Sequence, residues 1–295
     1  MCRHLAYLGP EIALGEVLTR PPHSLYQQSW APRRQRYGTV NADGFGVGWY
    51  APGDPVPARY RRSGPIWADL SVMDLARVVR SGALLGAVRD ATEAGADGEA
   101  AAAPFADGPW LFSHNGALLG WPDSAARLAA GLPAAELLGL AARCDSAFVW
   151  ALVRHRLNGG DTAAEALTET VAALAAAAPG SRLNLLVTDG ETITATAWGD
   201  TLWYLAAAAP GRRRTDAPRT DDRASALPAP EPTAAGPTAR GPMARGPAVG
   251  GPGQRVVVAS EPYDDDPRWH EVPDRTLLTA SRTDVLLTPL KEPCP

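Results

Sequence analysis

Cys2 becomes a candidate nucleophile if the initiator methionine is removed. Loss of Met1 leaves Cys2 with a thiol and a free α-amino group on the same Cα. Because an α-amino group titrates at about pKa 8, it could serve as the base for its own thiol near neutral pH. The alternative is a small buried hydrophobic residue, which is the common role of a free cysteine. Whether Cys2 is a nucleophile or a buried hydrophobic residue therefore depends on possible partners further along the chain.

Asn115 and Gly116 form a candidate oxyanion hole. They follow a strand predicted at residues 110–114. An asparagine side-chain N–H and a glycine backbone N–H are suitable donors for a developing negative charge. Asn-Gly is also a common turn, so the pattern alone leaves both interpretations open.

Two charged residues could hold a zwitterionic substrate. Arg89 ends the apolar stretch 84–88, and an arginine there could bind a carboxylate through two hydrogen bonds. Asp145, which follows Cys144 and precedes Ser146, could bind an ammonium group. The alternatives are a surface cation for Arg89 and an N-cap of the following helix for Asp145.

The composition limits the cofactors and partners to be expected. The three cysteines and five histidines show no CxxC, HxH or HExxH spacing, so we expect no metal and no other cofactor. The net charge of −4, without a long basic block, argues against nucleic acid. No signal segment precedes Cys2 and no run reaches about 18 apolar residues, so we expect a cytoplasmic protein with no membrane partner. The oligomeric state stays open.

The elements that must position these residues start with a strand. The apolar run 2–8 is typical of a buried strand. Residues 41–44 predict a turn, and the glycine-spaced segment 45–50 predicts a strand that another backbone approaches closely. Helical periodicity runs over 66–80, with Leu70 and Met73 among its apolar positions, and a strand is predicted at 84–88.

The second half of the chain predicts two helices and then strands. The first helix starts at Asp145, and the second follows the capping-box pattern Thr162 to Glu165. Asp189-Gly190 predicts a hairpin. The strands expected in this half are 183–188, 192–197, 201–205, 256–258, 275–280 and 285–287.

Residues 207–253 differ in composition from the rest. They consist almost entirely of Ala, Pro, Gly, Arg, Thr and Asp, which predicts a disordered low-complexity insertion. We expect Leu205 and Gln254 to be neighbouring strand ends, so that residues 2–295 form one domain. The pattern favours an α+β fold of mostly antiparallel strands with helices on the outer faces.

Taken together, these segments resemble the class II glutamine amidotransferase domain of the N-terminal nucleophile hydrolases. The resemblance rests on Cys2, residues 41–46, Arg89 with Thr92, Asn115-Gly116 and Asp145-Ser146. It implies a four-layer α-β-β-α sandwich of two mostly antiparallel sheets, with Cys2 at the start of a central strand.

The resemblance also implies roles for the site residues. Cys2 would be the nucleophile with its own α-amino group as base, and Asn115 and Gly116 would form the oxyanion hole. Arg89 would bind the α-carboxylate of a γ-glutamyl group, and Asp145 would bind its α-ammonium. Thr92 and His114 would be further substrate-binding residues. Residues 89–95 lack the tryptophan found in the corresponding loop of larger synthetases, and no synthase domain is present. A stand-alone hydrolase is therefore expected.

A narrower resemblance points to a substrate. Residues 1–9, 21–32, 41–50 and 259–262 look like the ergothioneine-pathway amidohydrolases of actinobacteria, which remove glutamate from γ-glutamyl-hercynylcysteine sulfoxide. This implies a small-molecule γ-glutamyl substrate. The rivals are a hydrolase of glutathione-like dipeptides, an ammonia supplier to a separate synthase, and a catalytically silent binding module of the same fold.

Three aromatic residues are candidates for the hercynyl end of that substrate. Hercynine carries a trimethylammonium group, which aromatic faces bind well. Trp30 and Trp67 fall outside the core periodicity, and Tyr26 lies near Trp30. Ordinary packing is the alternative for each.

Overall fold

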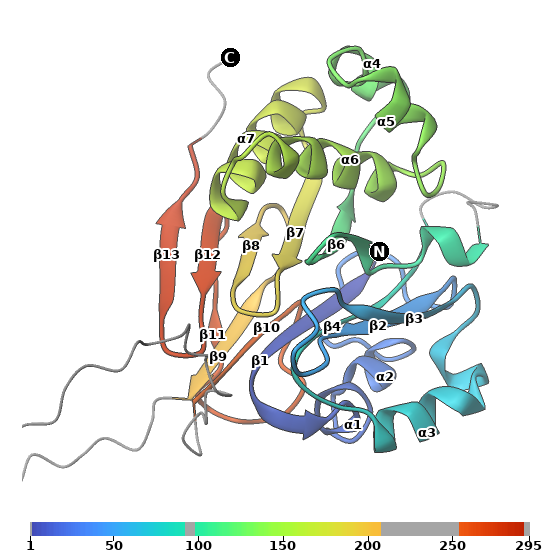
Figure 1. The fold of residues 1–295 in the computed structure, drawn as a ribbon, viewed down its shortest axis with the longest axis vertical. Helices are drawn as coiled ribbons and strands as arrows, with labels where there is room; N and C mark the ends of the chain where they lie inside the picture. Colours follow the sequence, from blue (N-terminus) through green and yellow to red (C-terminus); the bar gives the residue numbers. More distant parts are fainter. Residues whose placement is uncertain (1, 92–97, 208–253, 292–295) are drawn as a thin grey trace, which may run out of the picture.

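Two stacked antiparallel sheets form the centre of the molecule. The computed structural model describes residues 2–91, 98–207 and 254–291. Helices cover the outer face of each sheet (Figure 1). The result is the expected α-β-β-α arrangement, and the prediction of the fold class is confirmed.

The first sheet has β1 at its centre. Its strand order is β11-β9-β10-β1-β4-β2-β3, and every pairing is antiparallel. The strands are β1 (Arg3–Ala13), β2 (Phe45–Trp49), β3 (Ala58–Arg62), β4 (Arg80–Val88), β9 (Trp203–Ala207), β10 (Arg255–Ala259) and β11 (His270–Glu271). Because β1 lies between β4 and β10, the strand that follows Cys2 is paired along both of its edges.

The second sheet has the order β13-β12-β8-β7-β6-β5, again fully antiparallel. Its strands are β5 (Phe105–Asp107), β6 (Trp110–Ala117), β7 (Arg182–Thr188), β8 (Ile193–Ala197), β12 (Thr276–Ala280) and β13 (Val285–Pro289). The edge strands are therefore β11 and β3 in the first sheet and β13 and β5 in the second.

Helices pack on the two outer faces. The first sheet is covered by α1 (Gly15–Leu18), α2 (Leu25–Gln28) and α3 (Leu70–Val78), the last preceded by the 3-10 turn Ile66–Ala68. The second is covered by α6 (Asp145–Asn158) and α7 (Ala163–Ala177), with α4 (Ala126–Ala129) and α5 (Ala134–Leu138) beside them. Two further 3-10 turns, Gly98–Ala101 and Asp123–Ala125, complete the helical elements of these described ranges.

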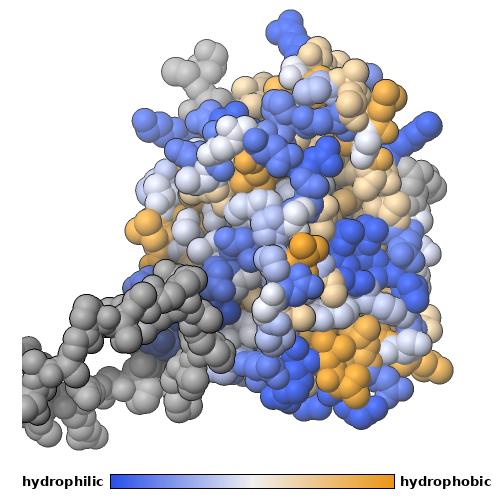
Figure 2. All heavy atoms as spheres, in the orientation of Figure 1, coloured by the Kyte–Doolittle hydropathy of each residue, from blue (hydrophilic) through white to orange (hydrophobic). Residues whose placement is uncertain are grey.

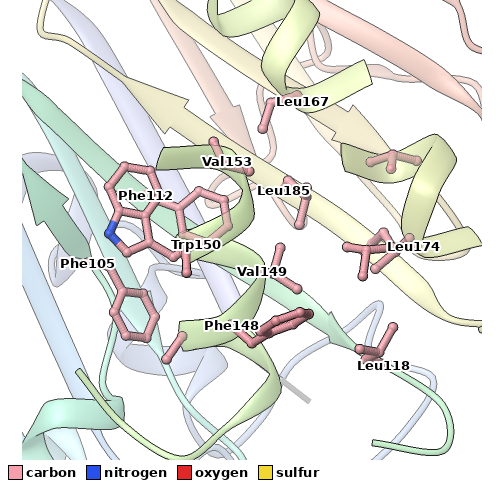
Figure 3. Close-up of a cluster of buried hydrophobic side chains, with 14 of the residues drawn as sticks. Phe105, Phe112, Leu118, Phe148, Val149, Trp150, Val153, Leu167, Leu174 and Leu185 are labelled. Carbon is pink, nitrogen blue, oxygen red and sulfur yellow. The ribbon is translucent and has the colours of Figure 1, made fainter. Parts of the chain in front are cut away.

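Alternation along the strands divides the core into three layers. In β1, Leu5 and Tyr7 pack towards α1–α3, whereas Ala6 and Leu8 pack between the two sheets. This is the period of two expected for a strand that is buried on both faces. The third layer lies under α6 and α7, where Phe112 and Leu185 from the strands meet Val149 from the helix (Figure 3).

Most predicted elements are present. The capping box of α7 forms through Thr162 and Glu165. Gly190, in the predicted hairpin, has φ +88°, which favours glycine. The close approach at β2 is also confirmed, since a Cβ on Gly46 would collide with the Ala103 carbonyl.

The predicted inner face of α3 is wrong at two positions. Leu70 and Met73 are exposed, and the helix buries Val72 and Ala76 instead. The Asp69 side chain caps the helix, accepting from the backbone of the next turn, and this fixes the register. An orange area is visible over this part of the surface (Figure 2).

The predicted insertion lies outside the described residues, apart from Ala207, which ends β9. Strands β9 and β10 are neighbours, with Ala207 opposite Arg255, as expected for the strand ends on either side of it. Among the described residues, no helix has the length and apolar content needed to cross a bilayer. The same residues contain no group of three or more potential metal ligands.

Candidate active site

Cys2 borders a small cavity at the start of β1. It is partly exposed, and the cavity around it is lined by Phe45, Val88, Arg89, Phe105, His114 and Ser146 among others. Burial raises the pKa of the Cys2 thiol, while a backbone hydrogen bond from Asp90 and the Arg89 charge act in the opposite direction. A base is therefore needed to form the thiolate near neutral pH.

Asn115 lies within β6, so the turn interpretation of Asn115-Gly116 is wrong. The residue pairs with Asn184 of β7 and is completely buried. Its Nδ2 donates to Ser260 Oγ at 3.1 Å. A primary amide nitrogen carries two N–H groups, so one is still available for an oxyanion.

Ser260 connects Asn115 to the strand that begins after Cys2. Its hydroxyl oxygen accepts from the His4 backbone N–H at 3.0 Å as well as from Asn115. Its own N–H donates to the His4 carbonyl at 2.9 Å. Reasoning from sequence gave Ser260 no role, because only the pairing of β1 with β10 reveals this position.

Gly116 and His114 sit against the same backbone carbonyl. A Cβ on Gly116 would collide with the Arg182 carbonyl and lie 2.6 Å from His114 Nε2, so only glycine fits. His114 Nε2 donates to that carbonyl at 3.0 Å, and Nδ1 lies 3.1 Å from Ser146 Oγ. These bonds fix the imidazole ring at the edge of the cavity beside Cys2.

A turn in the first sheet holds Arg89 at the cavity. The Arg89 N–H donates to Gly44 O at 2.7 Å, and its Nη1 donates to Asp43 O at 3.2 Å. The Asp43 carboxylate accepts from the Ala91 N–H at 2.8 Å. Gly44 has φ +142°, in the region that favours glycine. Thr92 follows directly and lies outside the described residues.

Asp145 is the first residue of α6, and its N-cap is Cys144, so the N-cap interpretation is wrong. Its carboxylate accepts from the Leu118 N–H at 3.0 Å and from the Ser146 N–H at 2.8 Å. The bonds tie the end of β6 to the start of α6. Oδ1 also lies 3.5 Å from the Ser146 hydroxyl, whereas Oδ2 accepts only from Leu118 and keeps a lone pair for a further donor.

The three aromatic residues form a single cluster. The ring centroids are 4.9 Å apart for Tyr26 and Trp30 and 5.7 Å apart for Trp30 and Trp67, both edge to face. Trp30 and Trp67 are 38% and 37% exposed. None of the three lines the cavity beside Cys2.

The aromatic cluster is nevertheless connected to the turn that holds Arg89. The Asn41 N–H donates to Ser29 O at 2.6 Å, and Asn41 Nδ2 donates to Gln28 O at 2.9 Å. Ser29 directly precedes Trp30, and Asn41 begins the turn. The segment that carries Trp30 is thus hydrogen-bonded to the turn 41–44, which in turn binds the backbone of Arg89.

Comparison of the sequence with known proteins shows the family. Residues 17–217 match the family model described as glutamine amidotransferases class-II. The chain is 38% identical over 291 residues to the gamma-glutamyl-hercynylcysteine sulfoxide hydrolase of Mycobacterium tuberculosis strain H37Rv, covering 98% of this chain and 97% of that protein. The enzyme of the same name from Mycolicibacterium smegmatis is 36% identical over 290 residues, with 98% and 100% covered.

Two solved structures share the fold. One is a glutamine aminotransferase class-II domain protein from Silicibacter pomeroyi, with a TM-score of 0.57 at 21% identity, covering 98% of this chain and all of that one. The other is the glutamine phosphoribosylpyrophosphate amidotransferase of B. subtilis, with a TM-score of 0.57 at 13% identity. It matches 98% of this chain and 49% of its own.

Proposed function

The chain belongs to the class-II glutamine amidotransferases, and from that premise we propose that it hydrolyses the γ-glutamyl amide bond of γ-glutamyl-hercynylcysteine sulfoxide. The products are glutamate and hercynylcysteine sulfoxide. The relatives that carry this activity in their names match the chain over nearly its whole length. The observation that carries the chemistry is the position of Cys2 at a cavity that Arg89 and His114 also line.

The proposed reaction proceeds through a thioester. After removal of Met1, the α-amino group of Cys2 takes the thiol proton, directly or through water. The sulfur then attacks the γ-carbonyl carbon, and the carbonyl oxygen becomes an oxyanion bound by Asn115 Nδ2 and the Gly116 N–H. The C–N bond breaks as the ammonium group returns its proton to the leaving amine. Water, deprotonated by the amine, then attacks the thioester and releases glutamate and the thiol.

The charged residues would bind the two ends of the glutamyl group. Arg89 takes the α-carboxylate and Asp145 takes the α-ammonium, with Thr92 and His114 alongside. Asp145 supports this role because its Oδ2 retains a lone pair after the bond from Leu118. We place Tyr26, Trp30 and Trp67 at the trimethylammonium of the hercynyl end, where exposed ring faces would favour a cation.

We place the reaction in a reducing cytoplasm, where the free thiols of Cys2 and Cys144 persist. We also propose that residues 2–295 act as one domain and that residues 208–253 are dispensable. The neighbouring positions of β9 and β10 support this, since a short connection could join them. Deletion of 208–253 with unchanged turnover would agree with it, and loss of turnover would contradict it.

The test is glutamate release from three compounds by the full-length protein. We expect γ-glutamyl-hercynylcysteine sulfoxide to be hydrolysed far faster than glutathione or glutamine. Cys2→Ala should be inactive on all three, whereas Cys144→Ala, a second free cysteine of the chain, should keep its activity. Equal rates on glutathione would favour the general dipeptide hydrolase, and stimulation of glutamine hydrolysis by a partner would favour ammonia supply. No turnover of any compound would favour a silent binding module.

A further inference from the structure

The strand orders give Cys2 two different flanks. In the first sheet, β1 has β4 and β2 on one side and β10 on the other, and in the second sheet β6 has β5 on one side and β7 on the other. The cavity beside Cys2 is lined from β2, β4 and β5, so it lies on the first flank. On the second flank, Thr201 Oγ1 donates at 2.8 Å to the carbonyl of Ser260, directly after β10. An amide whose glutamyl half fills the cavity therefore directs its amine half towards β7 and β10.

Arg182, the first residue of β7, lies next to the proposed oxyanion hole on this second flank. Asn115 pairs with Asn184, so Arg182 is the diagonal neighbour of Asn115 on the same face of the sheet. Diagonal neighbours of this kind lie about 7–8 Å apart, within reach of a long side chain. The Arg182 carbonyl also accepts from His114 and lies against Gly116.

The Arg182 guanidinium is held in place while its donors stay unused. Its Cζ lies 4.2 Å from the ring centroid of Tyr37, and its Nε lies 3.9 Å from Asp200 Oδ2, too far for a hydrogen bond. Within the described ranges, no group accepts a hydrogen bond from this side chain. A guanidinium stacked on a ring keeps its N–H groups in its own plane, so the edge formed by Nη1 and Nη2 is free for a ligand.

The segment that carries Tyr37 is anchored to the first sheet. The backbone N–H groups of residues 33–34 donate to the buried Glu261 carboxylate at 3.0 and 2.7 Å. Gln35 Oε1 accepts at 3.2 Å from Nε of Arg3, a completely buried residue of β1. Tyr37 is 53% exposed, so it is the surrounding segment and the stacking on Arg182, not burial, that keep its ring in place.

The same segment comes close to Cys2. Gly38 directly follows Tyr37 and has φ +71°, and a Cβ on it would collide with the Asp90 carboxylate. The Asp90 backbone makes a hydrogen bond to the Cys2 thiol. Residues 33–38 therefore bridge from the nucleophile in the first sheet to Arg182 in the second, at the end of the sandwich where the scissile bond must lie.

A carboxylate fits the free edge of Arg182. Carboxylates accept two parallel hydrogen bonds from the edge of a guanidinium. The two acidic side chains nearby leave this edge available, because Asp200 faces Nε and Glu261 accepts from the backbone of residues 33–34. In the proposed substrate, the anionic group nearest to the scissile nitrogen is the cysteinyl carboxylate, two bonds away on the departing amine.

We propose that Arg182, oriented by Tyr37, binds the cysteinyl carboxylate of the departing amine and so determines which γ-glutamyl amides are accepted. This rests on the proposed function, which supplies the amine half. Arg89 and Arg182 then hold one carboxylate on each side of the scissile bond. γ-Glutamyl amides of simple amines, which lack the second carboxylate, are bound less tightly.

The test measures binding to the full-length Cys2→Ala protein by calorimetry, so that turnover does not interfere. Two ligands are compared: γ-glutamyl-hercynylcysteine sulfoxide, and its analogue in which the cysteinyl carboxylate is a primary amide. Arg182→Gln is the informative variant because its side chain makes no hydrogen bond within the described ranges. Arg62→Gln is the matched control, since Arg62 on the edge strand β3 also stacks on a tyrosine, at 4.3 Å, and has its Nε 3.6 Å from an aspartate.

With Arg182 in place, we expect the acid to bind at least about tenfold more tightly than the amide. Arg182→Gln should remove most of that preference, Arg182→Lys should restore part of it, and Arg62→Gln should leave it unchanged. Tyr37→Leu, at an exposed position, should lower the preference several-fold, and it decides the matter if Arg182→Gln does not fold.

Equal binding of acid and amide by the parent overturns the proposal, as does a preference that survives Arg182→Gln or, where that variant is unfolded, Tyr37→Leu. In these cases the proposed function stands, because the substrate still binds. Failure of both ligands to bind overturns the proposed function and this site with it.

Discussion

The two sides of Cys2 are built differently. On the acyl side, Asn115 and Asp145 are buried, and each is bonded to a second element of the fold. On the amine side, the two proposed contacts Trp30 and Trp67 are 38% and 37% exposed. Rigid placement suits a bond-making step, whereas exposed aromatic side chains suit recognition of a variable group. Changes on the acyl side should therefore lower kcat, and changes on the amine side should raise KM.

The largest effect is expected from Asn115→Ala. The variant removes one of the two proposed oxyanion donors, and loss of such a donor typically lowers kcat by about 10² to 10³. Steady-state kinetics of glutamate release would measure it, with KM staying within a few-fold of the parent value. If KM rises while kcat is unchanged, Asn115 binds the ground state and the acyl side has been misassigned.

The second effect concerns stability at acid pH. Burial, the Arg3 charge and His114 lower the pKa of His4 to about 3 in the folded protein. The unfolded chain binds this proton below about pH 6.5, so stability should fall as pH drops from 6.5 towards 3, by about 1.4 kcal/mol per pH unit for this one group. Urea unfolding at several pH values measures the slope.

His4→Gln tests whether this slope belongs to the interior of the acyl side. His4 Nδ1 lies 3.2 Å from Ser113 Oγ, on the strand that carries Asn115. The variant should flatten the slope between pH 6.5 and 4. An unchanged slope would mean that other groups dominate the acid response.

A smaller effect is expected from Ser260→Ala. The hydroxyl orients the Asn115 amide but contacts no reacting atom, so kcat should fall by about tenfold, the value of one hydrogen bond, with little change in KM. Ser71→Ala, at an exposed serine, is the control. Full activity in Ser260→Ala would show that packing alone holds Asn115.

The smallest effect is expected from the aromatic cluster. Trp30→Ala and Trp67→Ala should each raise KM by a few-fold for γ-glutamyl-hercynylcysteine sulfoxide, the scale of an exposed cation–π contact. For a γ-glutamyl compound without the trimethylammonium, KM should not change. An equal rise in KM for both compounds would mean that Trp30 and Trp67 serve only to pack the fold and do not contact the trimethylammonium group.

The same comparison explains what the sequence could predict. The acyl side begins at an element with a strong local pattern, because Cys2 directly precedes the buried apolar run of β1. The resemblance to the class II glutamine amidotransferases, and not this local pattern, implied that Cys2 and Arg89 belong to one site. Asn115-Gly116 was misread as a possible turn because pairing with β7 overrides the local preference of Asn-Gly.

The amine side could be predicted only in part: Trp30 and Trp67 were named singly from the sequence, and the cluster that they form with Tyr26 appears only in the fold. Two segments far apart along the chain meet in this cluster, and no spacing rule links Trp30 to Trp67. Strand β3 was not predicted, because its segment Ala58–Arg62 contains three arginines and no alternation of apolar and polar residues. Such a polar strand is stable at the edge of a sheet, where one side is left unpaired. Sites assembled by topology in this way need the structure.

The most direct test of the account is mass spectrometry of the N-terminal peptide from enzyme quenched with acid during turnover. The account predicts a peptide that begins at Cys2 and carries a γ-glutamyl group on its sulfur, absent from Cys2→Ala. A fully active protein that retains Met1, or turnover without any such adduct under single-turnover conditions, would contradict it.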